Sequence, residues 1–320
     1  MMKKIVYMLY YEGYQKPIVD TVKTEKDVSC FQDFCLPFVR KLFELHNAWP
    51  LNNKHELPLK RLWFKRVLRG LDINDNDDIW FLMYESFHLS FSRKFLVYLK
   101  KRFRNARICF MFTNPVDEYN RSKINKVKPY YDAIITFFSR DADQQGFLFM
   151  PLQPVRIPVY EPKAEFCSDV FFVGKDKDRL DELLKCYEKF TETGLKCDFH
   201  IVDVPESKQK YTNVISYNKR IPYSEVLERE ASSKCILEIL QDNDDYISMR
   251  AAEAFSYGKK LITNSSAYRQ YSFYDPDRIW ILDDIDSFDK GFVEKDIDTT
   301  MDPINSFTNF RNFLYTIDRK

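Results

Sequence analysis

The segment from residue 241 to residue 264 holds the side chains best suited to bind an anionic ligand. An acidic loop precedes a helix that the pattern predicts over residues 247–257. Free N–H groups at the start of a helix bind anions, and Arg250 in the first turn can pair with a phosphate through two nitrogens. Ser248 stands at the same helix start, and Glu253 lies one turn further along, where a carboxylate can accept hydrogen bonds from ribose hydroxyls. These residues predict a nucleotide-binding site.

The same segment resembles the donor-binding signature of GT-B glycosyltransferases, especially the bacterial enzymes that build lipopolysaccharide and capsule. That signature is Glu-x7-Glu, followed by Ala, then Gly-Lys and an apolar strand. Here Asp245 and Glu253 are separated by seven residues, and the stretch from Glu253 to Lys259 matches the second part. Asp245 replaces the first Glu of the pattern, and Asp242 or Asp244 are alternatives for its role. The resemblance implies that this carboxylate lies near the transferred sugar.

Two further stretches carry the resemblance. Gly174-Lys175 follows an expected strand and is similar to the first turn of the GT-B donor domain, where a glycine lets the backbone approach the diphosphate and a basic residue neutralises it. Arg220 and Tyr223 lie in a stretch similar to the loop and helix that contact the nucleotide base. A plain turn for Gly174 and a hydrophobic staple for Tyr223 are the alternative interpretations.

The resemblance extends over about residues 165–285 and implies an activity. It predicts a glycosyltransferase of the hexosyltransferase type that uses a UDP- or GDP-sugar as substrate, with a glycan or lipid-linked acceptor. No bound metal and no other cofactor are expected, because the helix terminus and the cations would stabilise the leaving diphosphate. The acceptor belongs, by the same resemblance, to the first half of the chain.

Candidate catalytic residues in the first half follow an expected strand. Glu85 and His88 come directly after the strand predicted over residues 78–83. A carboxylate or an imidazole in a cleft can act as the general base for an acceptor hydroxyl. The alternative is a polar loop that only caps the next helix.

Basic residues cluster in the first half. The stretch from Arg93 to Arg107 contains seven Lys and Arg residues and no acid, with phenylalanines between them. A second cluster consists of Lys60, Arg61, Lys65, Arg66 and Arg69. Such runs are usually solvated helix faces, but two of them also predict docking on an anionic membrane surface.

The elements that must position these residues alternate between strands and helices. Apolar runs predict strands over residues 4–9, 78–83, 106–112, 133–138, 170–173, 197–202, 214–216, 234–239, 260–263 and 279–282. Helical periodicity lies between many of them, so we expect an α/β fold with parallel sheets. The predicted architecture is two Rossmann-like domains that face a cleft, over residues 1–160 and 161–300. The last helix, within residues 301–320, is expected to pack on the first domain, as in GT-B enzymes.

Composition excludes several classes of protein. The 320 residues include only 7 Gly and 4 His, with no Gly-x-Gly-x-x-Gly, Walker or Gly-x-Ser-x-Gly motif. Seven Cys without a Cys-x-x-Cys pair argue against disulfides and structural zinc. No signal peptide is expected, so we predict a cytoplasmic protein, with peripheral attachment to the inner face of the membrane as a further hypothesis.

Two other functions compete with the glycosyltransferase hypothesis. The basic and aromatic first half, with a net charge of +8 over residues 1–165, could bind nucleic acid. The second half carries −7 and no recognition motif is present, so no nucleic-acid partner is expected. Three Asp-x-Asp motifs could indicate a metal-dependent GT-A transferase, but the first of them, at residues 75–77, precedes its strand instead of following it.

Overall fold

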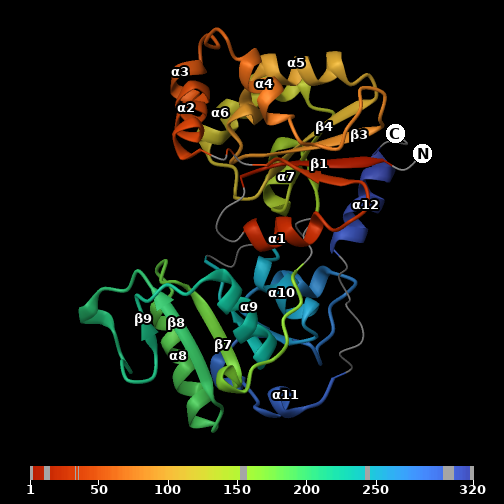
Figure 1. Ribbon diagram of the computed structural model, residues 1–320. Coiled ribbons are helices and arrows are strands. Elements are labelled where there is room, and N and C mark those ends of the chain that lie inside the picture. The colour runs from red at the N-terminus through yellow and green to blue at the C-terminus, as the bar shows by residue number, and fades with distance from the viewer. Residues whose placement is uncertain are drawn as a thin grey trace. The chain divides into compact units, whose positions relative to one another are not determined.

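A computed structural model gives the fold of the chain (Figure 1). It describes residues 3–10, 15–32, 34, 36–151, 157–241, 246–297 and 306–317. The chain divides into two compact units, Met1–Pro151 and Leu152–Lys320. Each unit is built around one six-stranded sheet, and every strand pairing is parallel.

The sheet of the first unit has the order β2-β1-β3-β4-β5-β6. Its strands are β1 (Lys4–Met8), β2 (Val28–Cys30), β3 (Ile79–Tyr84), β4 (Ala106–Phe112), β5 (Ala133–Thr136) and β6 (Leu148–Phe149). All six residues of β3 are buried, as expected for a central parallel strand covered on both faces. The chain proceeds from β1 to β2 on one side and then crosses to β3 on the other side of β1.

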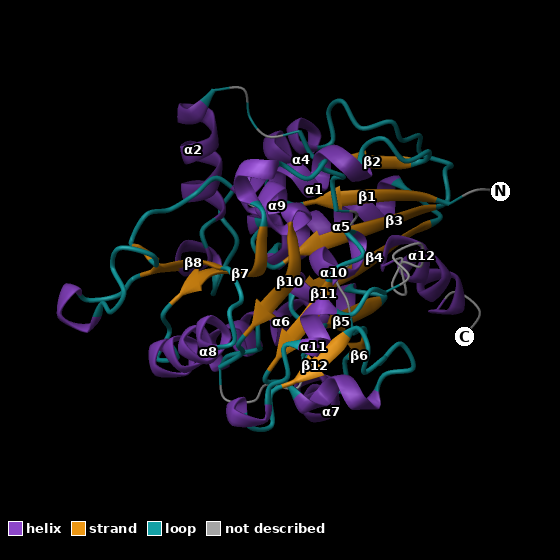
Figure 2. Ribbon diagram, turned by 90° about the horizontal axis from the view of Figure 1, so that it is seen from below, coloured by secondary structure: helices purple, strands orange, loops and turns teal. Residues whose placement is uncertain are grey.

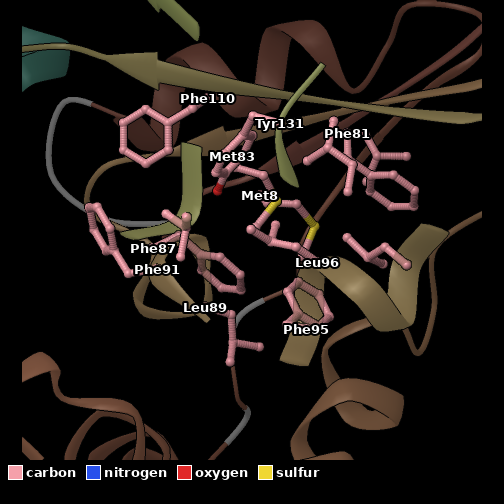
Figure 3. Close-up of a cluster of buried hydrophobic side chains, with 14 of the residues drawn as sticks. Met8, Phe81, Met83, Phe87, Leu89, Phe91, Phe95, Leu96, Phe110 and Tyr131 are labelled. Atoms are coloured by element: carbon pink, nitrogen blue, oxygen red, sulfur yellow. The ribbon is translucent and has the colours of Figure 1, made fainter. Parts of the chain in front are cut away.

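Helices lie on both faces of this sheet (Figure 1), and Figure 2 shows its strands side by side. The helices are α1 (Gln15–Val22), α2 (Pro37–Asn47), α3 (Trp49–Asn52), α4 (Arg61–Val67), α5 (Arg93–Arg102), α6 (Glu118–Val127) and α7 (Ser139–Gln145). Helix α5 begins where the Ser92 hydroxyl accepts a hydrogen bond from the N–H of Phe95. Its apolar side chains Phe95, Leu96 and Leu99 are buried. They pack with residues of β3 and of the 3-10 helix η1 (His88–Phe91) in one aromatic-rich core (Figure 3).

The sheet of the second unit has the order β12-β11-β10-β7-β8-β9. Its strands are β7 (Ser168–Lys175), β8 (Cys197–Val202), β9 (Ser216–Tyr217), β10 (Ser233–Glu238), β11 (Lys260–Thr263) and β12 (Ile279–Ile281). Counted within the unit and read from β9, this is the 3-2-1-4-5-6 order of the Rossmann fold. The chain again runs outward on one side of its first strand, β7, and then crosses to β10 on the other side.

The helices of the second unit are α8 (Leu180–Glu192), α9 (Tyr223–Ser232), α10 (Met249–Ser256), α11 (Gly291–Glu294) and α12 (Ser306–Ile317). Helix α8 buries one apolar face, with Leu183 and Phe190 fully covered. That face packs with Phe172 of β7 and Phe199 of β8 in the core of the unit. The central strands of this sheet are therefore covered by helices, and mainly the strand ends are accessible to a ligand.

Most of the expected strands are confirmed within two residues at each end, and the expectation of an α/β fold with two parallel sheets is correct. Two strands were not expected, β2 and β6, which are three and two residues long. The strand expected over residues 214–216 is formed by Ser216–Tyr217 instead. The cleft between the domains, the boundaries at residues 160 and 300, and the packing of the last helix on the first domain stay predictions.

Candidate functional site

Each sheet has a switch point, a pair of neighbouring strands from which the chain continues in opposite directions along the sheet. In doubly wound α/β proteins, ligands bind beyond the carboxyl ends of the strands at such a point. In the first unit it lies between β1 and β3, which pair from Lys4–Ile79 to Met8–Met83. In the second unit it lies between β7 and β10. Most of the chemistry-bearing residues expected from the sequence lie at one of these two places.

Two arginines meet over the carboxyl end of β7. Arg250 donates a hydrogen bond to the carbonyl of Val173. Arg179 donates to the carbonyl of Lys175 from Nη2 at 3.0 Å and from Nε at 3.2 Å. It also donates to the carbonyl of Ile239, directly after β10, so its guanidinium bridges the two strands of the switch point.

Gly174 makes room for this pair. A Cβ atom at this position would lie 2.9 Å from Nη2 of Arg179 and 3.1 Å from Nη2 of Arg250. Both guanidiniums also lie 5.5 Å from the centre of the Phe172 ring. The glycine expected to approach a diphosphate therefore lies beneath two cations, and a side chain there would displace them.

The arginine pair has the electrostatics of an anion site. Burial, together with the charge of Arg250, lowers the pKa of Arg179 to about 10. The Nε atom of Arg250 is buried and has no hydrogen-bond partner among the described residues. An anion between the two guanidiniums would relieve their repulsion and supply that missing partner. Arg250 was predicted from the sequence, whereas Arg179, which lies five residues after Gly174, was not.

Ser248 holds the start of helix α10. Its hydroxyl accepts a hydrogen bond from the N–H of Arg250 at 3.1 Å and donates one to the carboxylate of Glu238. Glu238, fully buried at the end of β10, also accepts from Thr263 at 2.6 Å and from Tyr268 at 2.9 Å. Ser248 is therefore positioned by a buried carboxylate, and it in turn fixes the turn that carries Arg250.

Glu253 lies in a buried acidic pair. The hydroxyl of Tyr223 donates a hydrogen bond to its carboxylate. Burial raises the pKa of Glu253, and burial together with the charge of Glu253 raises the pKa of Glu230 well above its ordinary value. Both carboxyl groups therefore hold a proton to a higher pH than an exposed carboxyl group does. The expected ribose-binding residue and the expected base-contacting residue, Tyr223, are thus brought together.

Lys175 and Arg220 form a separate, exposed group. The ammonium of Lys175 lies 2.9 Å from the carboxylate of Asp203, and Arg220 lies 3.8 Å from its other oxygen. The acidic partner neutralises part of their charge, so the two cations are weaker anion ligands than the buried arginines. Asp245, with Asp242 and Asp244, lies outside the described residues.

The two candidate bases of the first unit line one cavity of about 260 Å³. Oε1 of Glu85 accepts a hydrogen bond from Thr113 at 2.7 Å and one from Asn114, whereas its buried Oε2 has no partner among the described residues. Nδ1 of His88 lies 2.6 Å from the hydroxyl of Tyr10, which follows β1. Both candidate bases therefore lie beyond the carboxyl end of β3, at the switch point of this sheet.

Burial sets the protonation of both groups in this cavity. It lowers the pKa of His88, with help from the charge of Lys123, so the imidazole is neutral near pH 7. It raises the pKa of Glu85, which brings the carboxylate closer to the working range of a general base. The ammonium of Lys123 lies 4.1 Å from the ring centre of Phe91 in the same cavity wall.

The basic stretch from Arg93 to Arg107 is divided in the structure. Lys100 pairs with Asp132 at 2.8 Å and Arg102 with Asp75 at 3.0 Å. Arg93 instead lines a second cavity of about 540 Å³, which shares Trp49 and Phe91 with the first. Part of the charge that the sequence displays is therefore neutralised by ion pairs.

Two kinds of feature were not found in the described part of the chain. No group of three or more His, Cys, Asp or Glu residues there has an arrangement that could hold a metal ion. None of the helices described is long and apolar enough to cross a membrane.

No model of a known protein family matches the sequence, and no curated protein matches it significantly. Solved structures with a similar fold include TarM, 13% identical with a TM-score of 0.47 over 83% of this chain, which spans 59% of the TarM chain. An alpha-glucosyltransferase in complex with UDP-glucose and DNA containing an abasic site is 11% identical, with a TM-score of 0.49, 99% of this chain and 92% of that chain covered. The spinosyn rhamnosyltransferase SpnG is 10% identical with a TM-score of 0.44, and both chains are covered completely. These three similarities concern the fold alone.

Proposed function

We propose that the chain is a glycosyltransferase that moves a hexose from a nucleotide-sugar to a hydroxyl group of a glycan or lipid-linked acceptor, in the synthesis of a bacterial surface polysaccharide. The observation that carries the proposal is the pair Arg179 and Arg250 above Gly174, at the switch point of a sheet with the Rossmann order. Such a site suits the diphosphate of a UDP- or GDP-sugar.

In this proposal the donor binds to the second unit. The diphosphate lies against the two guanidiniums and the start of α10, and Glu253 accepts hydrogen bonds from the ribose once the nucleotide displaces the Tyr223 hydroxyl. Lys175 and Arg220 contact the outer part of the nucleotide. Asp245 acts nearer the sugar, as the sequence motif implies. The cations stabilise the negative charge that develops on the diphosphate as its bond to the sugar breaks, so no metal ion is needed.

The acceptor binds to the first unit, with its hydroxyl in the cavity of Glu85 and His88. Transfer breaks the bond between the sugar and the diphosphate and forms a glycosidic bond to the acceptor oxygen. The proton of the acceptor hydroxyl passes to one of the two bases. Among the described residues Oε2 of Glu85 has no partner, and His88 is neutral near pH 7, so each can accept it.

A donor screen by calorimetry tests the proposal. The full chain is titrated with UDP, GDP and their common hexose derivatives, and glycan and lipid-linked hydroxyl acceptors are then added with the nucleotide-sugar that binds. We expect one nucleotide class to bind in a 1:1 ratio without added divalent metal, and the free nucleoside diphosphate to appear with acceptor. If no nucleotide-sugar binds, the proposed function is wrong.

A further inference from the structure

Helix α2 presents apolar side chains on its exposed face. Phe38, Leu42 and Leu45 follow one another at spacings of four and three residues and are 70%, 42% and 62% exposed. Leu36 before the helix is also exposed. Residues at this spacing lie on one side of a helix, so Phe38, Leu42 and Leu45 share the exposed side of α2, and Leu36 directly precedes it.

This exposed side is not the result of poor packing. The opposite face of α2 is anchored by Phe43, which is fully buried and lies 5.4 Å from the ring centre of Trp63 in α4. Nε1 of Trp63 donates a hydrogen bond to Nδ1 of His46 at 2.8 Å. Helix α2 therefore has a packed inner face and a second apolar face that is directed to solvent.

The exposed apolar residues continue into the next two helices. Leu51 of α3 and Leu62 of α4 are exposed, and Leu59, between them, is 74% exposed. Leu59 also has a φ of 60°, a conformation that a leucine rarely adopts. Because its side chain is exposed, burial in the core does not explain this conformation. We call the seven residues of this patch the α2–α4 surface: Leu36, Phe38, Leu42, Leu45, Leu51, Leu59 and Leu62.

Positive charge surrounds the α2–α4 surface. Residues 36–69 contain eight Lys and Arg residues but only two acidic residues, Glu44 and Glu56. Arg40 forms an ion pair with Glu44 at 2.8 Å. The hydroxyl of Ser92 donates a hydrogen bond to the carboxylate of Glu56 at 2.6 Å. The exposed cations of this segment are Lys41, Lys54, Arg61, Lys65, Arg66 and Arg69. A second copy of the same chain would present the same charge, so self-association through this surface is disfavoured.

We propose that the α2–α4 surface is a membrane-docking surface for anionic lipid. Its apolar side chains enter the boundary between headgroups and acyl chains, and the surrounding cations contact the lipid phosphates. Large exposed apolar side chains bordered by polar residues are a mark of interaction surfaces. The surface corresponds to the second basic cluster of the sequence, whereas the run from Arg93 to Arg107 is partly neutralised by ion pairs.

Vesicle flotation of the full chain tests the proposal, without donor or acceptor. Vesicles of phosphatidylcholine alone are compared with vesicles that also contain phosphatidylglycerol. We expect the chain to bind the anionic vesicles, more weakly as salt is added. Leu42→Ser and Leu45→Ser should each weaken binding about tenfold, because each removes one large apolar side chain from the lipid. Lys65→Glu with Arg69→Glu should weaken binding to anionic vesicles at least as much.

Two control variants match these substitutions. Leu148→Ser removes an exposed leucine of the same unit outside the surface, and Lys101→Glu reverses an exposed charge on α5. Both should bind vesicles as the wild type does. The proposal is wrong if the controls lose as much binding, or if neutral and anionic vesicles bind equally. It is also wrong if sedimentation without lipid shows a dimer that Leu42→Ser dissociates. The same holds if the surface binds an acidic protein and no vesicle. Because neither donor nor acceptor is present, these outcomes leave the glycosyltransferase proposal unaffected.

Discussion

The guanidinium groups of Arg179 and Arg250 lie over the same glycine, although the two residues come from different halves of the sheet. Arg179 follows β7 and reaches across to the carbonyl after β10, and Arg250 begins α10 and reaches back to β7. Each arginine thus binds backbone of the strand on the other side of the switch point. A ligand between them would contact both halves of the unit at once.

Replacement of either arginine should weaken nucleotide binding. Arg179→Ala and Arg250→Ala each remove a charge-assisted contact worth about 1.5–3 kcal/mol, so the dissociation constant for the bound nucleoside diphosphate should rise about ten- to 150-fold. Calorimetry measures this directly. Lys185→Ala, which removes an exposed cation of α8, is the control and should bind normally. Wild-type affinity in both arginine variants would show that the diphosphate binds elsewhere.

Gly174→Ala should have the same effect through displacement of the arginines. The added methyl group would lie 2.9 Å from Nη2 of Arg179, 3.1 Å from Nη2 of Arg250 and 3.1 Å from Cζ of Phe172, so the guanidiniums must move to make room for it. We expect nucleotide affinity to fall at least tenfold, with a change in melting temperature of only a few degrees. Calorimetry combined with thermal denaturation checks both expectations. A variant that binds the nucleotide normally would exclude the glycine from the site.

The acidic pair of Glu230 and Glu253 should make stability depend on pH. Both carboxyl groups have a pKa above the ordinary value in the folded chain, so the folded state binds more protons than the unfolded state above about pH 4.5. Stability should therefore fall as the pH rises from 4.5 through the raised values. Glu230→Gln should reduce this dependence, which denaturant titration across that range will reveal. An unchanged pH slope would mean that the two groups titrate normally.

Glu253→Gln should distinguish binding of the nucleoside from binding of the phosphates. If Glu253 accepts hydrogen bonds from the ribose, the substitution weakens binding of UDP or GDP but leaves binding of inorganic pyrophosphate almost unchanged. Calorimetry with the two ligands gives the comparison. Tyr223→Phe is the matched variant, because it removes the hydroxyl that donates a hydrogen bond to the Glu253 carboxylate. Equal losses for both ligands in Glu253→Gln would contradict ribose binding.

Lys60 should oppose folding at neutral pH. Its side chain is buried, and burial lowers its pKa from 10.5 to about 8, although the carboxylate of Glu56 lies 3.7 Å away and acts in the opposite direction. Between pH 8 and 10.5 the unfolded chain binds more protons, so stability should rise with pH in that window. Lys60→Met should raise the free energy of unfolding at pH 7 by at most about 3 kcal/mol and flatten the rise. If the free energy of unfolding of the variant still rises between pH 8 and 10.5, another group causes the rise.

The strands were predictable because buried parallel strands are continuous apolar runs. The stretches around Phe81 and Phe110 have this property, and they form β3 and β4. Strands β2 and β6 were missed since each is only two or three residues long, too short for any periodicity. The same reasoning placed Glu85 and His88 after β3, because residues after a strand of a parallel sheet lie at its ligand-binding edge.

The rest of the candidate site depends on contacts between distant segments. Arg179 looks like an ordinary residue before a helix, and its role becomes visible only when β10 lies beside β7. Glu230 looks like a solvated helix carboxylate, yet it is fully buried against Glu253. Leu42 and Leu45 fit the apolar pattern of a core helix, and only the packing of Phe43 on Trp63 shows that they are on the outside.

The order of the second sheet also determines when its site can exist during folding. Strand β7 must pair with β10 across the whole of β8, β9 and their helices, as the pairing of Val170 with Cys235 shows. Closing so large a loop is slow compared with forming a local helix. Arg179 and Arg250 come together only after this step. A ligand held by both therefore recognises chains whose folding is finished, and it should slow their unfolding without accelerating their refolding.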